Sequence, residues 1–166
     1  MMTSTIEQRL QALGLSLPVP WVLPPGTLTG SILVRVRGAR ILVGGHVPLD
    51  SQGHVCGPFG RVGAEVSLEQ AQEAARRTLL AILASLKKEL GSLDLIESWL
   101  HVGGFVNTAP TFTDFPRVIN AASPLITDIF GEERGSHARL ALGAGGLPWG
   151  APVEMEAELS LAERSK

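Results

Sequence analysis

Ala138-Arg139-Leu140-Ala141-Leu142-Gly143-Ala144 is predicted to be a β-strand with a single charged residue, Arg139. Strand side chains alternate between two faces, so Leu140 and Leu142 are predicted to point one way. Arg139 is predicted to share the other face with Ala141 and Gly143, which are both small. After a glycine-rich turn, a second strand is predicted from Val153 to Leu161.

The face that carries Arg139 has two interpretations. A guanidinium beside a hollow lined by small residues is suited to binding the carboxylate of a small acid, because its planar set of five N–H donors can bond both carboxylate oxygens at once. The alternative is that Arg139 pairs with Glu154 or Glu156 on a solvated face of the sheet, as most strand charges do. Spacing alone favours the second interpretation, because most strand charges face water.

Upstream of this stretch, the strongest helix signal runs from Leu68 to Leu90. Ser67-Leu68-Glu69-Gln70 is a capping-box pattern, apolar residues follow at helical spacing, and Gly91 ends the run. A second helix is predicted from Phe115 to Phe130, with Asp114 as its cap.

The remaining elements are strands. The pattern predicts a hairpin from Ile32–Arg37 and Arg40–Val43 with a type II′ turn at Gly38, and a further strand from Leu95 to Val106. The order strand, strand, helix, strand, helix, strand, strand predicts a two-layer α/β (α+β) domain, a mixed sheet with both helices on one face. Residues 31–166 form this single domain, and residues 1–30 an N-terminal extension with a short helix.

Composition limits the class of function. The 166 residues are 45% hydrophobic and 18% charged, as in one globular domain, and the formal charge of −2 argues against nucleic acid. Cys56 is the single cysteine, which excludes an internal disulfide and favours a reducing compartment, and no apolar run suits a signal or a membrane span. We therefore expect a cytoplasmic protein without membrane contact. The four histidines have no metal-ligand spacing and no phosphate loop is complete, so neither metal nor cofactor is expected.

Several motifs resemble the reactive-intermediate (imine) deaminase family, the Rid or YjgF-like proteins, also called the endoribonuclease L-PSP family. The similarity runs from about residue 32 to residue 161. The segments that carry it are Val43–Asp50, Gly103–Asn107, Phe115–Asn120, Ala138-Arg139, Gly146-Leu147-Pro148-Trp149-Gly150 and Val153–Ala157.

The resemblance implies a chorismate-mutase-like fold and hydrolytic deamination of reactive 2-imino or 2-enamino acids, of the 2-iminobutanoate or 2-iminopropanoate type, to 2-oxo acids and ammonia. It implies that Arg139 binds the carboxylate, that Glu154 positions water or substrate, and that Asn120 contributes. Our site prediction adds four substrate-binding residues, namely Gly44, His46, Ala141 and Gly143.

The resemblance also implies a homotrimer with one ligand cleft at each subunit interface. We expect the uncovered face of the sheet to carry Arg139, Ala141 and Gly143 and to be buried against another copy. Arg139 of one subunit is then predicted to face residues Gly44–Phe59 of its neighbour.

The chain departs from the family pattern at three places. Gly44 stands where archetypal members carry serine, the chain has no tyrosine, and no cysteine follows Arg139. Two alternatives to the enzyme therefore stay open: a trimer that binds small carboxylates without catalysis, and a structural protein in which Arg139 is an interfacial ion-pair partner.

Overall fold

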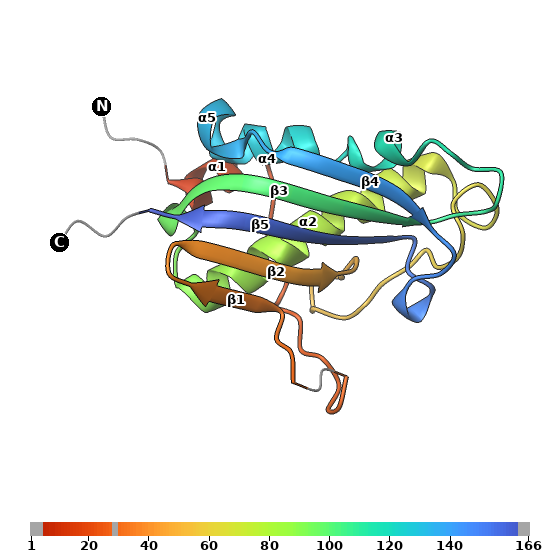
Figure 1. Cartoon of the computed structure of the whole chain (residues 1–166), viewed down its shortest axis with the longest axis horizontal. Helices are drawn as coiled ribbons and strands as arrows, with labels where there is room; N and C mark the ends of the chain where they lie inside the picture. The colour runs from red at the N-terminus through yellow and green to blue at the C-terminus, as the bar shows by residue number, and fades with distance from the viewer. Residues whose placement is uncertain (1–4, 28–29, 163–166) are drawn as a thin grey trace.

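A five-stranded sheet forms one layer of the molecule (Figure 1). The computed structural model describes residues 5–27 and 30–162. The strand order is β1-β2-β5-β3-β4. Among the strand pairs of residues 5–27 and 30–162, only β3 and β4 are parallel, which confirms the predicted mixed sheet. The strands are β1 (Val34–Arg37), β2 (Arg40–His46), β3 (Ile96–Asn107), β4 (Ala138–Ala144) and β5 (Val153–Leu161).

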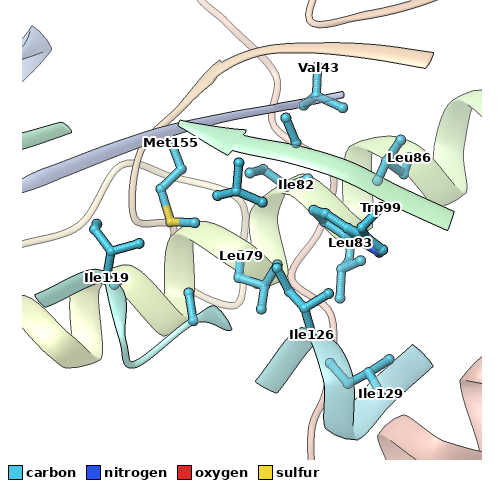
Figure 2. Close-up of a cluster of buried hydrophobic side chains, with 14 of the residues drawn as sticks. Val43, Leu79, Ile82, Leu83, Leu86, Trp99, Ile119, Ile126, Ile129 and Met155 are labelled. Atoms are coloured by element: carbon cyan, nitrogen blue, oxygen red, sulfur yellow. The ribbon is translucent and has the colours of Figure 1, made fainter. Parts of the chain in front are cut away.

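The helices form the second layer, on one face of the sheet. The α2 helix (Leu68–Leu90) runs behind the sheet in Figure 1, and α3 (Phe115–Ile119) and α4 (Ser123–Phe130) lie along β4. Ser67 and Gln70 form the predicted capping box at the start of α2. Figure 2 shows the core between the layers, where side chains of α2 meet Val43 and Met155 of the sheet. The two-layer α+β prediction is confirmed.

The predicted helix from Phe115 to Phe130 is wrong as a single element. It is interrupted at residues 120–122, and α4 begins again at Ser123 with Pro124 in its first turn. Proline has no backbone N–H and cannot continue the hydrogen-bond ladder of the preceding turn, so it favours a new helix start. The short α5 (Glu132–Gly135), absent from the prediction, follows α4.

The prediction for the two faces of β4 is also wrong. The face of β4 that points to the helices carries Arg139, Ala141 and Gly143. Their partners on β3 include Val102, which is buried. On the same face, Ile119 packs over Gly104 of β3 and Phe115 packs over Gly143. The open face instead carries Leu140 and Leu142, which are 42% and 44% exposed. Small residues lie on the helix side because α3 approaches the sheet too closely for larger ones.

The N-terminal extension packs onto the domain. Ile6 and Leu10 of α1 (Ile6–Ala12) are buried in the main core, and Trp21 belongs to a second buried cluster. Residues 1–4 and 28–29 of the predicted extension lie outside the described residues. Two 3-10 turns, η1 (Leu93–Leu95) and η2 (Pro148–Gly150), precede β3 and β5.

Candidate functional site

Arg139 lies near the start of the edge strand β4, held from one side by neutral groups. Its Nη1 atom donates to Oδ1 of Asn120 at 2.7 Å and to Oγ of Ser123 at 3.3 Å. Within the described residues, Nε and Nη2 make no hydrogen bond and no carboxylate pairs with the side chain. The ion pair with Glu154 or Glu156 is therefore wrong, and two nitrogens of the guanidinium, Nε and Nη2, keep their N–H donors available for an anion.

The interruption between α3 and α4 provides both acceptors. Asn120 is the C-cap of α3 and Ser123 opens α4, so one turn places both side chains beside Arg139. The structure thus brings together Arg139 and Asn120, the two residues of this turn and strand to which the resemblance assigns ligand contacts.

Ser123 and His137 complete this arrangement and were not predicted as site residues. His137 donates through Nδ1 to the carbonyl of Gly135 at 2.7 Å, which leaves Nε2 to accept from the Ser123 hydroxyl at 3.0 Å. The Ser123 oxygen is then oriented toward Arg139. No periodicity marks these residues, because the contact depends on how the turn at residues 120–122 folds back.

The hollow predicted beside Arg139 is filled. A Cβ atom on Gly143 would lie 2.6 Å from the ring of Phe115, and Ala141 packs against the main core.

Glu154 forms a second centre near the start of β5, on the open face. Its carboxylate lies over Gly45, where any side chain would overlap it, and it accepts no hydrogen bond from the described residues. Burial raises the pKa of the Glu154 carboxyl, and the neighbouring Glu156 adds to the shift. A partly desolvated carboxylate with a raised pKa is a stronger base than an exposed carboxylate, which suits it to proton transfer.

The two centres lie on opposite faces of the sheet. Arg139 of β4 is paired with Val102 of β3, which is buried against the helices. Glu154 of β5 is paired with Phe105, which lies an odd number of residues after Val102 on β3. Since successive strand residues alternate in direction, one chain does not hold both side chains on one small ligand.

The other two predicted ligand residues lie in β2. Gly44 and Gly45 form a bulge where the register with β5 shifts, which places Gly44 close to the backbone carbonyls of Ile32 and Leu33. His46 is fully buried, and both ring nitrogens are hydrogen-bonded, one to Gly44 and one to Ser85. The structure therefore does not expose His46 to a ligand.

Two further properties concern the described residues as a whole. No group of three or more His, Cys, Asp or Glu side chains in residues 5–27 and 30–162 is arranged to hold a metal ion. Nor does any helix in these ranges have the length and apolar character needed to cross a bilayer.

The fold defines a class, the small two-layer α+β proteins with a five-stranded mixed sheet covered by helices on one face. No family model matches the sequence. Protein TCP17 of Trypanosoma cruzi is 35% identical over 156 residues, 94% of each chain. Atu1372 from Agrobacterium tumefaciens, a protein of unknown function with a crystal structure, is 36% identical in sequence, and its structure matches with a TM-score of 0.83. The match covers 95% of this chain and 92% of Atu1372.

A protein of Shewanella oneidensis MR-1, proposed to be an endoribonuclease, is 26% identical with a TM-score of 0.86 over 95% of this chain and 100% of that one. The chain belongs to the YjgF-like, or endoribonuclease L-PSP, family. The match of 156 residues to the T. cruzi protein leaves at most ten residues unmatched, so it includes most of the N-terminal extension.

Proposed function

We propose that the protein hydrolyses reactive 2-imino and 2-enamino acids to 2-oxo acids and ammonia. The observation that carries the proposal is the state of Arg139, whose Nη1 is fixed by Asn120 and Ser123 while Nε and Nη2 have no partner among the described residues. A planar pair of unused donors matches the two oxygens of a substrate carboxylate.

The chemistry requires little more than positioning. Water adds to the electrophilic imine carbon to give a carbinolamine, and the carbinolamine expels ammonia to leave the carbonyl. Glu154 would carry a proton from the attacking water to the imine nitrogen, and then the hydroxyl proton of the carbinolamine to the same nitrogen, which leaves as ammonia. This task suits a carboxyl whose pKa is raised by burial. Holding substrate and water together contributes the rest of the acceleration.

We further propose that the site forms between two copies of the chain. Arg139 and Glu154 lie on opposite faces of one sheet, so a ligand that touches both requires Arg139 from one copy and Glu154 from the next. The open face with Leu140 and Leu142 would be buried in this assembly. Cyclic closure gives a homotrimer of roughly 53 kDa, three times the 17.6 kDa chain.

A second candidate function is binding of a small carboxylate without catalysis. E. coli TdcF, a structural neighbour with 15% identity and a TM-score of 0.52, was solved with bound serine. Gly44 in place of the serine of archetypal members favours this candidate, because the chain lacks a hydroxyl there. In either case the ligand is a small acid. We also propose that the protein is cytosolic, because a chain with a single cysteine forms no internal disulfide and suits a reducing compartment.

The deciding experiment uses an amino acid oxidase to generate a 2-imino acid and follows ammonia release with and without the protein. We expect faster release with the wild type and no acceleration with Arg139→Ala or Glu154→Gln. If the wild type does not accelerate release but 2-oxo acids raise its melting temperature, the binding candidate is correct. If neither effect occurs, both candidates fail.

A further inference from the structure

His46 is a fully buried polar side chain that the proposed chemistry does not use. Its Nδ1 atom lies 2.8 Å from the carbonyl oxygen of Gly44, and its Nε2 atom lies 2.9 Å from Oγ of Ser85 in the C-terminal part of α2. A carbonyl only accepts, so Nδ1 carries the proton and Nε2 accepts from the Ser85 hydroxyl. The pair links the second layer of the fold directly to the backbone of β2.

The point where this link meets β2 is the bulge. The register between β2 and β5 shifts between Val43 and His46, so Gly44 and Gly45 form the irregular part. A bulge redirects the strand and needs an anchor for the carbonyl that leaves the ladder. The imidazole of His46 provides that anchor from inside the core.

The bulge in turn determines the surroundings of Glu154. Gly45 lies directly under the Glu154 carboxylate, so a small displacement of this backbone changes both the space and the solvation of the carboxylate. The contacts therefore form a continuous series from Ser85 through His46 and Gly44 to Gly45 and Glu154.

We infer that His46 and Ser85 are positioning residues, which fix the Gly44–Gly45 bulge and thereby the Glu154 carboxylate. This inference rests on the proposed role of Glu154. Packing alone does not require this pair, because an apolar side chain would fill the same buried volume without two hydrogen bonds to satisfy. Burial also lowers the pKa of His46, which keeps the ring neutral and able to accept from Ser85.

The test compares three variants of the full-length protein. His46→Gln retains one donor and one acceptor, His46→Leu removes both, and Ser85→Ala removes the donor to Nε2 while leaving the bond to Gly44. Two properties are measured for each: kcat and KM for imine hydrolysis, and the titration of the Glu154 carboxyl by carbon NMR, with Glu154→Gln used to assign the signal. The NMR measurement needs no substrate.

We expect kcat to fall about tenfold or more in His46→Leu with KM changed less than about threefold, since Arg139 is untouched. The titration midpoint of Glu154 should shift in the same variant. His46→Gln should recover most of kcat and the wild-type midpoint, and Ser85→Ala should lie between these extremes. If His46→Leu does not fold, the comparison of Ser85→Ala with the wild type decides.

The inference is overturned if His46→Leu folds and shows an unchanged kcat and an unchanged Glu154 titration. If His46→Leu does not fold, the same result for Ser85→Ala overturns it. If the wild type shows no imine hydrolysis, the proposed function fails on its own. The NMR titration then still decides whether His46 positions Glu154.

Discussion

At the scale of single residues, the account depends on how Arg139 is held. Two neutral acceptors orient the guanidinium without cancelling its charge, since Asn120 and Ser123 provide oxygens but no negative charge. A carboxylate partner would have made Arg139 a structural ion pair. Neutral partners instead leave the full charge for a ligand, which is how a preorganised anion site is built.

We predict that Arg139→Ala lowers the affinity for a small 2-oxo acid by about 100-fold or more, or about 2.8 kcal/mol, because two charge-assisted hydrogen bonds are lost. Arg139→Lys should recover little, since an ammonium does not reproduce the planar fork. Isothermal titration calorimetry measures both. Arg76→Ala, which removes an exposed arginine of α2, serves as the control and should bind normally. An unfolded Arg139→Ala protein would instead indicate a structural arginine.

Glu154 should reduce stability at neutral pH. Its pKa in the folded protein is raised above the ordinary 4.5, so the folded state binds the proton more tightly than the unfolded state does. Stability is then lost as the pH rises through the raised pKa. We predict that Glu154→Gln melts at a higher temperature than the wild type at pH 7 and that the difference shrinks toward pH 4.

The control for this prediction is Glu158→Gln on the same face and strand. Glu158 pairs with Arg40 at 2.7 Å, so its removal should not stabilise the protein. Equal melting temperatures of Glu154→Gln and the wild type at both pH values would show that the Glu154 carboxylate is not destabilised by its surroundings.

At the scale of elements, the sequence predicted the regular parts well. The α2 helix and strands β4 and β5 begin and end at the predicted residues, because each has a clear period and clear ends. The interruption before α4 was missed, since residues 115–130 are apolar at helical spacing on both sides of Pro124.

The faces of β4 were assigned the wrong way for a different physical reason. Two leucines alternating with small residues normally indicate that the leucines face the core. Here α3 lies so close to the sheet that only Ala141 and Gly143 fit, and the leucines point outward. Arg139 and Asn120 were predicted from family resemblance, whereas Ser123 and His137 depend on a turn that no local pattern reveals.

The bulge of β2 gives a prediction with an adjacent control. A methyl group at Gly45 would overlap the Glu154 carboxylate, whereas at Gly44 its nearest neighbour would be a carbonyl oxygen at an ordinary 3.6 Å. We predict that Gly45→Ala lowers kcat for imine hydrolysis at least about tenfold and that Gly44→Ala changes it less than about twofold. Equal effects of the two substitutions would contradict the placement of Glu154 over Gly45.

At the scale of the whole molecule, the open face of the sheet should be an interface between copies. We predict that Leu142→Asp, which places a charge among the exposed leucines of β4, converts the roughly 53 kDa trimer to the 17.6 kDa chain. Light scattering at about 10 µM measures the mass. Val22→Asp, at an apolar residue that is 75% exposed in the extension, should remain trimeric. A wild-type protein of monomeric mass would exclude the shared site.

Arg139 and Glu154 are proposed to act on one ligand from different copies, and mixing two inactive variants distinguishes this arrangement from a site within one copy. Arg139→Ala and Glu154→Gln are unfolded together in equal amounts, refolded, and checked for mixed trimers by mass spectrometry. A site is complete when one copy provides Arg139 and the next provides Glu154, which occurs with a probability of one half times one half. We therefore expect about a quarter of wild-type activity.

Wild type mixed equally with the double variant is the reference for this measurement. Sites shared between copies predict about a quarter of the activity in both mixtures. Sites contained in a single copy predict no activity from the two single variants and about half from the reference mixture. Mixed trimers of Arg139→Ala and Glu154→Gln that remain inactive would contradict the account.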